Sequence, residues 1–344
     1  MSIDEPQRSA TLDDVARAAG VSRSTASRVM NGSSRVVLEP TRRRVAAAAS
    51  QLGYIANAAA QATARGRTET IAFLVNAVSD DYFSPIAVGV FRAAERVDAL
   101  VTFASFNDNP AQATRIVSTL RGQRPQAIII AGSRTVSNRD FDRLVAELEA
   151  FEREGGRVVT ISQEGLPFDT VAIDNVAGGR QIARRAMELG YRRFAIFAGP
   201  RDALTARDRT HGMSAELAEH QLAPSAEWIF HSDFGRDGGY AAAGEYLRRS
   251  SGTDCILASS DAIAIGAMAR FREAGVPIPE AVAISGFDDL AMLRDVHPAL
   301  TTLHLPWDEV GEAALTLATR PKASRQLIVL SGYPVVREST PARA

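Results

Sequence analysis

A short segment near the start of the chain carries side chains that suit contact with nucleic acid. Arg23 and Arg28 can each donate paired hydrogen bonds to the edge of a guanine. Ser24 and Ser27 lie beside them in the sequence, and hydroxyl groups bind both bases and phosphates. The segment therefore favours DNA recognition, although the same pattern also fits an ordinary amphipathic helix in a small bundle.

The distribution of charge also favours a polyanionic partner for this end of the chain. The 344 residues have a net charge of −1. Residues 1–67 contain ten Arg and five acidic residues, a net charge of +5, whereas the remainder has a net charge of −6. A basic head on a mildly acidic body is typical of proteins whose one end meets nucleic acid. Chance and a solvated helix face remain the alternative explanation of the charge alone.

The sequence lacks the patterns that would indicate an enzyme or a metal site. There is no G-x-S-x-G, no H-E-x-x-H and no P-loop, and the single lysine, Lys322, has no glycine-rich lead. The five histidines lack metal-site spacing, and the single cysteine, Cys255, excludes a disulfide framework and a cysteine-built zinc site. We expect no catalytic residues, no metal and no cofactor.

Length and composition predict a soluble protein with two or three domains. The sequence is 46% hydrophobic and 23% charged, which is enough for a packed core and a solvated surface. No apolar run approaches the ~18 residues of a membrane span. The segment Met1–Pro6 has no basic start and no apolar stretch behind it, so a secretory signal is not expected. These features predict a cytoplasmic, nucleoid-associated protein without a membrane partner.

The polar segment is expected to be held by two short helices and a tight turn. Thr11 and Asp14 form a capping-box pattern at the start of the first helix, and Gly20 ends it. Ser22 is the expected N-cap of the second helix, which Asn31 and the following glycine end. Two short helices joined in this way form a helix-turn-helix, whose second helix enters the major groove of DNA.

A third helix and an alanine-rich hinge are predicted next. The helix is expected from about Thr41 to Leu52, after Pro40 and before Gly53. The three arginines at 42–44 oppose its dipole, so a phosphate partner would help explain them. The alanine-rich segment that follows is short enough to be marginal as a free helix.

Beyond residue 69 the sequence alternates between strand and helix patterns. The expected strands are Thr70–Asn76, Ala99–Phe106, Ala127–Ala131 and Val158–Ser162, then Thr170–Ile173, Arg193–Phe197, Trp228–His231, Cys255–Ala258 and Val282–Ser285, with a last one at Val335–Glu338. Continuous apolar strands that alternate with helices indicate buried parallel sheets. Two such sets predict two similar lobes with a cleft, and open α/β sheets bind ligands beyond the carboxyl ends of their strands.

The head resembles the DNA-binding head of the lactose/galactose-repressor (LacI-type) family. The resemblance rests on TLDDVARAAGVSRSTASRVMNG and on TRRRVAAAASQLGYIANAAAQ. It implies that Arg23, Ser24 and Arg28 read bases, while neighbouring polar groups hold the DNA backbone. The DNA-binding residues expected from it are Ser22, Arg23, Ser24, Thr25, Ser27, Arg28, Asn31, Tyr54, Asn57, Ala60, Gln61 and Thr63.

The head departs from the family pattern in ways that affect the hinge. Leu38 replaces the usual capping serine, and the loop 31–37 is one residue longer. Ala56 replaces the hinge proline, and Thr63 replaces the leucine that the family inserts into the minor groove. An apolar wedge unstacks and kinks DNA, which a threonine does poorly. We therefore hypothesise weaker bending of the operator; equal bend angles for the wild type and Thr63→Leu in a gel-phasing assay would contradict it.

The same resemblance covers nearly the whole chain. Segments such as TARDRTHGM and SDAIAIGAMARFREAGVPIPEAVAISGFDDLAM resemble the family's effector domain, which is related to periplasmic sugar-binding proteins. An aromatic face would bury one side of a ring, while charged groups bind hydroxyls or polar edges. The ligand-binding residues that the resemblance implies are Tyr82, Phe83, Ser162, Arg207, Phe234, Ser260 and Asp288.

Each of these assignments has a structural alternative. Phe234 fits a core position, Arg207 fits a surface ion pair with Asp202 or Asp208, and Asp288 fits a helix N-cap, a role that the neighbouring aspartate can also take.

Some family positions carry shorter or apolar side chains. Ser162 stands where an aspartate is common, Ser260 where an asparagine is common, and Leu305 where a polar residue is common. Loss of hydrogen-bonding reach weakens the assignment of a sugar, so a smaller, less hydroxylated or more apolar ligand is an alternative.

Together these features predict the organisation of the chain. The fold class is an all-α helix-turn-helix head with a hinge, followed by a two-lobed, periplasmic-binding-protein-like α/β effector domain with parallel sheets. The expected boundaries are 1–55 for the head, 56–68 for the hinge helix and linker, and 69–344 for the effector-binding and dimerisation domain. Its first lobe is expected at about 69–166 and 306–324, and its second at about 167–303 and 326–340.

The predicted function is that of a homodimeric, sequence-specific transcriptional regulator of the repressor type. It would bind a near-palindromic operator in double-stranded DNA and respond to a sugar or related metabolite between the lobes. A ligand-independent regulator, a solute-binding protein with a vestigial head and, less favoured, a two-lobed enzyme remain alternatives.

Overall fold

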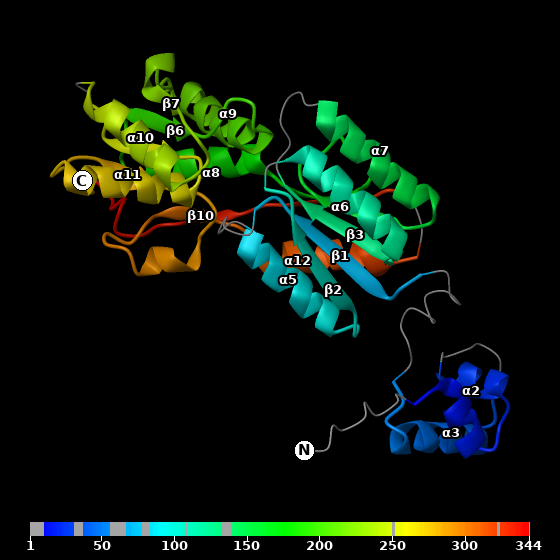
Figure 1. Ribbon diagram of the computed structural model, residues 1–344. Helices are drawn as coiled ribbons and strands as arrows, with labels where there is room; N and C mark the ends of the chain where they lie inside the picture. Colours follow the sequence, from blue (N-terminus) through cyan, green and yellow to red (C-terminus); the bar gives the residue numbers. More distant parts are fainter. Residues whose placement is uncertain are drawn as a thin grey trace, which may run out of the picture. The chain divides into compact units, whose positions relative to one another are not determined.

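The computed structural model describes residues 10–30, 37–55, 67–77, 83–107, 109–132, 139–249, 252–321 and 324–343. The chain divides into two compact units, which are Met1–Glu69 with Gln123–Pro125, and Thr70–Gly122 with Gln126–Ala344. The first unit contains three short helices and is called the head below. The second unit contains parallel sheets covered by helices and is called the body (Figure 1).

The head has the helix boundaries that its capping residues predict. Its helices are α1 (Leu12–Ala18), α2 (Arg23–Met30) and α3 (Glu39–Gln51). The Thr11 hydroxyl accepts a hydrogen bond from the Asp14 backbone amide, and the Asp14 carboxylate accepts one from the Thr11 amide, which confirms the capping box. Gly20 has a φ of +64°, the left-handed conformation that ends α1. The amide of Thr25 donates to the Ser22 hydroxyl, which confirms the second cap.

The interior of the head is small and consists mainly of alanine and valine. Val15, Ala26 and Val45 come from the three different helices and are fully buried. Short side chains allow three short helices to approach one another closely. α3 begins two residues earlier than the expected Thr41, with a proline in its first turn.

The body contains a first lobe built on a six-stranded parallel sheet. The strand order is β11-β5-β4-β3-β1-β2. The strands are β1 (Thr70–Val75), β2 (Leu100–Ser105), β3 (Ala127–Ala131), β4 (Arg157–Ile161), β5 (Asp169–Ile173) and β11 (Leu327–Leu330). The helices of this lobe are α5 (Phe83–Glu95), α6 (Pro110–Gln123), α7 (Arg139–Arg153) and α12 (Trp307–Thr319).

Alternate residues of each strand of the first lobe face different helical layers. In β1, Phe73 belongs to a buried cluster with Ile86 and Val90 of α5, whereas its neighbour Leu74 belongs to a cluster with Leu144 of α7. This alternation follows from the pleat of the strand. Helices α5 and α12 therefore cover one face of the sheet, and α6 and α7 cover the other (Figure 1).

The second lobe repeats this construction on a smaller sheet. Its strand order is β7-β6-β8-β9, all parallel, from β6 (Phe194–Ala198), β7 (Ile229–His231), β8 (Cys255–Ala258) and β9 (Ala283–Ser285). Helices α8 (Asn175–Glu188) and α9 (Leu204–Glu219) cover one face, and α10 (Arg236–Leu247) and α11 (Asp261–Glu273) cover the other. Two parallel α/β lobes confirm the expected fold class for the body.

The predicted division of the strands between the lobes was wrong at two strands. Residues 167–173 and 326–330 were assigned to the second lobe, but β5 and β11 belong to the first sheet, where β5 pairs with both β4 and β11. The Thr160 and Thr170 hydroxyls lie 2.8 Å apart across β4 and β5, and Asp169 bonds to Arg157 and Arg320. The alternation of strand and helix patterns predicts where strands occur. It does not predict which sheet a strand joins, because that depends on these cross-strand contacts.

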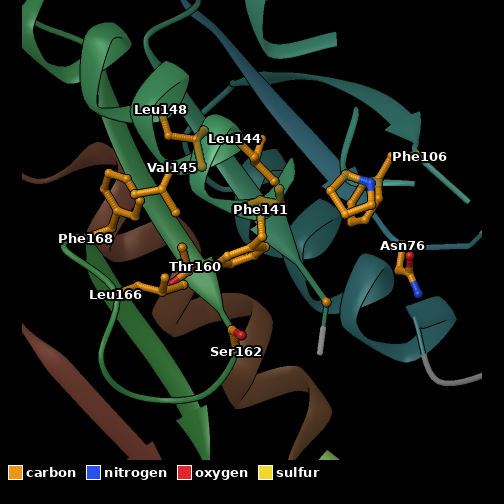
Figure 2. A pocket seen from close by; sticks show the side chains of 13 residues that line it. Asn76, Phe106, Phe141, Leu144, Val145, Leu148, Thr160, Ser162, Leu166 and Phe168 are labelled. Carbon is orange, nitrogen blue, oxygen red and sulfur yellow. The ribbon is translucent and has the colours of Figure 1, made fainter. Parts of the chain in front are cut away.

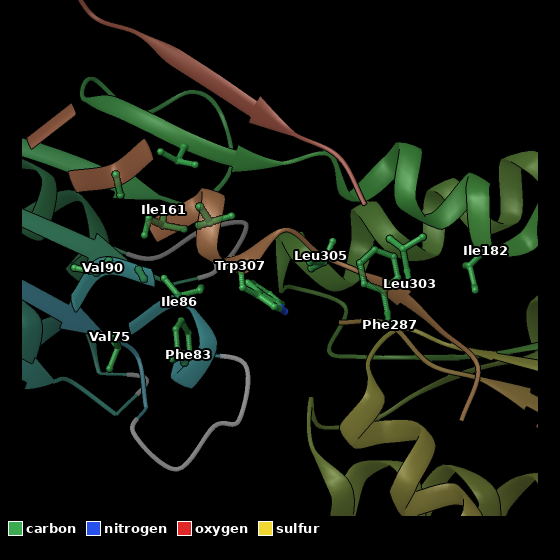
Figure 3. Packing of buried hydrophobic residues seen from close by; sticks show 14 of the residues in the cluster. Val75, Phe83, Ile86, Val90, Ile161, Ile182, Phe287, Leu303, Leu305 and Trp307 are labelled. Atoms are coloured by element: carbon green, nitrogen blue, oxygen red, sulfur yellow. The ribbon is translucent and has the colours of Figure 1, made fainter. Parts of the chain in front are cut away.

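The chain passes between the lobes through two short strands, of which the sequence predicted only the second. β10 (Thr302–His304) pairs antiparallel with β12 (Tyr333–Val335), which begins two residues before the expected Val335 and ends at it. Beside this ribbon, one buried cluster continues from the first lobe into the second. Figure 3 shows Trp307 and Leu305 of this cluster between Ile86 of the first lobe and Phe287 of the second. The two lobes therefore share part of their interior.

Candidate functional sites

The first candidate site is the surface of α2. Ser22, Arg23 and Ser24 are exposed, and Thr25, Ser27 and Arg28 are half-buried. The Arg23 Nε atom lies 3.4 Å from an Asp13 carboxylate oxygen, an exposed pair that contributes little stability. Arg28 forms no ion pair with any other residue that the structure describes. The head thus presents a short helix with two cations and several hydroxyls, which fits a DNA groove.

Two arginines of α3 have an intramolecular counter-charge in Glu39. Arg42 and Arg43 both lie near the Glu39 carboxylate, at 3.8 and 3.2 Å. An acidic residue in the first turn offsets the unfavourable position of these cations in the helix dipole. Because both pairs are exposed, Glu39 offsets the placement of Arg42 and Arg43 only in part.

Several predicted DNA-binding residues lie outside the described residues. These are Asn31, Asn57, Ala60, Gln61 and Thr63, and the hypothesis on DNA bending lies outside with them.

Two further residues of the head, Tyr54 and Leu38, lie among the described residues. Tyr54 is described and packs, half-buried, against the apolar core of the head. Leu38 provides no side-chain cap to α3, as expected for a leucine at that position.

The second candidate site is a buried ion pair in the second lobe. The Arg209 Nη2 atom of α9 lies 2.8 Å from an Asp288 carboxylate oxygen, and both side chains are almost completely buried. Arg209 also donates from Nε to the Asn175 side-chain oxygen and from Nη1 to the Ser259 carbonyl, each at 2.8 Å. A buried charge is tolerated when it is paired and hydrogen-bonded in this way.

Close packing of α8 on α9 fixes the position of Arg209. A Cβ atom on Gly212 would lie 2.1 Å from the Val176 carbonyl oxygen, and one on Gly179 would lie 2.3 Å from the Arg209 carbonyl oxygen. Only glycine permits this approach of the two helices. Gly212 follows Arg209 by three residues, so both lie on the buried face of α9.

Two aromatic rings lie beside the guanidinium of Arg209. Its carbon atom is 3.9 Å from the centroid of Phe287 and 5.9 Å from that of Phe234. Phe287 is fully buried, whereas Phe234 is half-buried and lies against Gly199, just after β6. The arrangement places a partly accessible ring next to a buried cation, a combination that can hold a flat or ring-shaped molecule with polar edges.

The structure distinguishes between the alternatives for the predicted ligand residues. Arg207 is 55% exposed and pairs with the neighbouring Asp208, so the surface alternative describes its position. Arg209, two residues later, is the arginine of α9 that is fully buried and pairs with Asp288. Its spacing from Gly212 and the buried Met213 was the available sequence signal.

The remaining predicted ligand residues have different surroundings. Asp288 is not an N-cap, because it pairs with Arg209 and has a φ of 121°. Ser260 caps α11 through its hydroxyl, and Phe83 lies in the core shared by the lobes. Leu305 is likewise fully buried in that core, and Tyr82 lies outside the described residues.

A second buried carboxyl group lies close to the ion pair. Asp261 accepts hydrogen bonds from the Thr302 hydroxyl at 2.6 Å and from the Leu290 amide at 3.0 Å. Complete burial, followed by the negative charge of Asp288, raises its pKa to about 7. The ends of α11 and β9 therefore hold a carboxyl that gains a proton more easily than an exposed aspartate does.

The neighbouring Asp289 has the opposite tendency. Burial acts to raise its pKa, but hydrogen bonds from Arg337 at 2.6 Å and from the His304 ring at 2.9 Å outweigh that effect and lower it. Asp289 thus ties the loop that carries Asp288 to the β10–β12 ribbon.

The first lobe approaches this site through residues that follow its strands. Ser162 follows β4, and its hydroxyl donates to the side chain of Gln163 at 3.2 Å. Gln163 in turn donates to the Thr205 hydroxyl of α9 at 2.6 Å. The indole of Trp307 donates to the Asp288 carbonyl at 2.9 Å. The edge of the first sheet is thereby linked to α9, and α12 of the first lobe to the loop that holds Asp288.

The described residues give no support for a metal centre or a membrane segment. They contain no group of three or more His, Cys, Asp or Glu side chains that could hold a metal ion. Among the same residues, no helix is both long enough and apolar enough to span a bilayer.

Comparison with known families matches both units of the chain. Residues 11–57 match the family described as bacterial regulatory proteins, lacI family, and residues 183–340 match the periplasmic binding protein-like domain. The chain is 31% identical to the HTH-type transcriptional regulator CelR of Thermobifida fusca, over 97% of this chain and 99% of that one. It is 30% identical to the regulator DegA of Bacillus subtilis, over 96% and 98%.

Solved structures show the same arrangement of elements. The Lac repressor dimer bound to operator and the anti-inducer ONPF has a TM-score of 0.84 at 25% identity and covers 97% of this chain and 100% of that one. The CelR–cellobiose complex has a TM-score of 0.70 at 29% identity, with coverage of 96% and 99%.

Proposed function

Because the chain belongs to the lacI family of bacterial regulatory proteins, we propose that it is a ligand-controlled, sequence-specific transcriptional repressor. The observation that carries this proposal is a likeness that runs through head and body together, in relatives that are named as transcriptional regulators. Such a protein acts on DNA in the cytoplasm and needs no catalytic group.

We assign DNA reading to the head. Arg23, Ser24 and Arg28 on α2 would contact base edges in the major groove, since the first two are exposed and Arg28 has no ion-pair partner among the described residues. Ser22, Thr25 and Ser27 would hold the DNA backbone. Residues 56–68 are assigned as the hinge, most of which lies outside the described residues.

We assign effector binding to the body, around Arg209, Asp288 and Phe234. The CelR complex contains cellobiose and the Lac repressor complex contains ONPF, so a hydroxylated ring is the ligand class that the likeness supports. Arg209 and Asp288 offer a donor and an acceptor for such a molecule, and Phe234 offers an apolar face. A ligand that binds one arrangement of the lobes more tightly shifts the population toward it and changes operator affinity reciprocally.

We further propose that the active form is a homodimer, as in the Lac repressor structure named above. β2 is an edge strand of the first sheet, and beside it α5 leaves apolar side chains exposed. The exposed residues are Val88, Phe91, Val97, Leu100 and Phe103. Apolar patches of this kind mark protein interfaces, and a twofold dimer suits a near-palindromic operator. A Leu100→Glu variant should sediment as a monomer in analytical ultracentrifugation where the wild type is a dimer.

The central experiment is selection of bound sequences from a random DNA pool with the full-length protein. We expect a near-palindromic consensus for the wild type and loss of base preference at one position of each half-site for Arg28→Ala. A lost bidentate contact to guanine corresponds to about 1–3 kcal/mol. Arg207→Ala, which changes an exposed arginine of the body, is the matched control and should keep the consensus.

The outcomes separate the regulator from its alternatives. No enrichment by the wild type, or enrichment that is unchanged by Arg28→Ala, would contradict sequence reading by α2. A consensus in a protein that no sugar or metabolite stabilises against heat would favour a ligand-independent regulator, because a bound ligand at 100 times its Kd adds about 2.7 kcal/mol.

A further inference from the structure

The interior of the first lobe contains a cavity that the proposed effector site does not use. It has a volume of about 100 Å³ and lies between the sheet and the helices α6 and α7. Figure 2 shows Phe141, Leu144 and Leu148 of α7 lining it, opposite Thr160 and Ser162 of the sheet. The cavity is thus on the face of the sheet that α6 and α7 cover.

Most residues that line the cavity are apolar, and the hydroxyl groups of two of its polar residues are hydrogen-bonded. The Thr160 hydroxyl is paired with the Thr170 hydroxyl at 2.8 Å, and the Ser162 hydroxyl donates to Gln163. A water molecule needs two to four polar partners, whereas an apolar guest needs only apolar surface, which the side chains of α7 supply here. An engineered apolar cavity of ~150 Å³ binds benzene, so about 100 Å³ suits a smaller group such as a branched alkyl chain.

The cavity reaches the carboxyl edge of the first sheet, where ligands of such sheets bind. Asn76, Gly132 and Ser162 line it, and they follow β1, β3 and β4 respectively. Gly132 leaves room at this edge, since a Cβ atom there would meet Phe106 at 3.4 Å.

The rim of the cavity is also close to the buried ion pair. Ser162 contacts Gln163, and Gln163 contacts Thr205 of the second lobe. Thr205 precedes Arg209 by four residues on α9, a rise of about 6 Å along the helix. The rim of the cavity and the guanidinium are therefore two hydrogen bonds and about one helical turn apart, within the span of one small molecule.

We propose that this cavity is a subsite for an apolar group of the effector, so that the effector is amphipathic. Its polar ring would bind at Arg209 and Asp288, and a small alkyl group would enter the first lobe between α7 and the sheet. This inference rests on the proposed function for the polar end of the ligand. The apolar end of the ligand would bind in a different region, the cavity of the first lobe. The polar site and the cavity can therefore be tested separately.

The first experiment tests the cavity without assuming any polar group. Full-length protein with ¹³C-labelled isoleucine and leucine methyl groups is titrated with xenon and followed by NMR. We expect saturable shifts for the methyl signals of Ile130 and Leu148, which line the cavity. The signals of Ile256 and Ile284, in the second-lobe core, should stay in place. The absence of a saturable shift at Ile130 and Leu148 would overturn the proposal.

The second experiment tests whether the cavity belongs to the effector site. The free sugar, the methyl glycoside and the isobutyl glycoside of D-glucose are compared by thermal shift and calorimetry on the full-length protein. We expect the isobutyl compound to bind about tenfold or more tightly than the methyl compound, because three further carbon atoms become buried. Equal affinities, together with xenon binding, would show an accessible cavity outside the effector site and would overturn the subsite.

Filling variants separate this proposal from the proposed function. Leu144→Phe should abolish the xenon shifts and the advantage of the isobutyl glycoside, while the affinity for the free sugar remains. Val145→Ile is a milder filling variant from the same helix, in case the larger ring prevents folding. If no glucoside binds to either protein while xenon still shifts Ile130 and Leu148, the cavity is accessible but the glucoside subsite is overturned. If the free sugar binds, but Leu144→Phe leaves the isobutyl advantage intact, the proposed function stands and the subsite is rejected.

Discussion

The two lobes of the body share one construction but fill their interiors differently. Under α10 and α11 the second lobe packs aromatic rings edge to face. The ring centroids are 5.3 Å apart for Phe197 and Phe230, and 5.6 Å apart for Tyr246 and Phe271. The corresponding layer of the first lobe, under α6 and α7, contains the cavity. The second lobe also holds Arg209, Asp288 and Asp261 in buried positions.

This difference indicates that the two lobes are suited to bind different parts of a ligand. Buried charges need a rigid, fully packed surrounding, because a small displacement removes the hydrogen bonds that compensate their desolvation. An apolar group has no directional requirement and needs only space. The second lobe is therefore suited to fix the polar part of a ligand, and the first lobe to accept or exclude its apolar part.

The largest effect is expected from breaking the buried ion pair. Arg209→Ala leaves Asp288 buried without its cation, and removal of one partner of a buried pair costs about 3–5 kcal/mol. Urea denaturation of the body should register this loss. Arg207→Ala, two residues away and 55% exposed, should change the free energy of unfolding by less than about 0.5 kcal/mol. Similar values for the two variants would show that the polar site of the second lobe is not rigidly buried.

A pH-dependent effect is expected from Asp261 of the second lobe. Because burial raises its pKa to about 7, the native protein binds a proton that the unfolded chain releases above pH 4. This carboxyl therefore contributes stability at low pH that is lost as the pH rises toward 7. Asp261→Asn removes the titration, so its stability relative to the wild type should grow by up to ~1.4 kcal/mol per pH unit between pH 4 and pH 7.

The hydrogen bond from Thr302 provides the control for this titration. That bond acts to lower the pKa of Asp261, so Thr302→Val should extend the pH-dependent window above 7. Denaturation midpoints measured from pH 4 to pH 8 are sufficient. Parallel curves for the wild type and Asp261→Asn would mean that Asp261 stays ionised throughout this range.

Enlarging side chains in the two interiors should give unequal costs. Ala267→Leu adds bulk to the fully buried second-lobe core, where overpacking costs about 1–3 kcal/mol. Val145→Ile adds one methylene group beside the first-lobe cavity and should be neutral or slightly stabilising. Thermal unfolding of both variants measures the contrast. A destabilisation of Val145→Ile by more than about 1 kcal/mol would mean that the first lobe is as tightly filled as the second.

Local sequence signals predicted the elements because local chemistry forms them. The capping box at Thr11 and Asp14 and the turn at Gly20 are decided within a few residues, and each has the expected geometry. The alternation of apolar strands with helices likewise predicted the parallel sheets. The assignment of β5 and β11 depends instead on pairing between distant strands, which no local pattern contains.

The residues of the candidate effector site were predicted less completely than the elements, because contacts between helices decide which side chains face the site. Arg207 and Arg209 differ by two positions, and on a helix this places them on nearly opposite faces. The resemblance pointed to the first of them, whereas the packing of Gly212 against α8 turns Arg209 inward. Ser260 has the chemistry of a ligand residue but is used as a helix cap, and Phe83 is used in the core. Residue type alone does not distinguish these uses.

The smallest effect concerns the contact by which the two lobes meet. Gln163 of the first lobe donates to the Thr205 hydroxyl of the second, and a neutral hydrogen bond contributes about 0.5–1.5 kcal/mol to stability. A double-mutant cycle of Gln163→Ala and Thr205→Ala should give a coupling energy in this range. Gln112→Ala, whose side chain bonds to the Ser105 carbonyl within the first lobe, should show no coupling to Thr205. Because this contact lies between the cavity rim and Arg209, the coupling energy should rise when a ligand occupies both lobes. A coupling energy of zero with and without ligand would show that the two lobes are energetically independent at this contact. Coupling between the lobes would then have to run through the buried Trp307–Asp288 hydrogen bond.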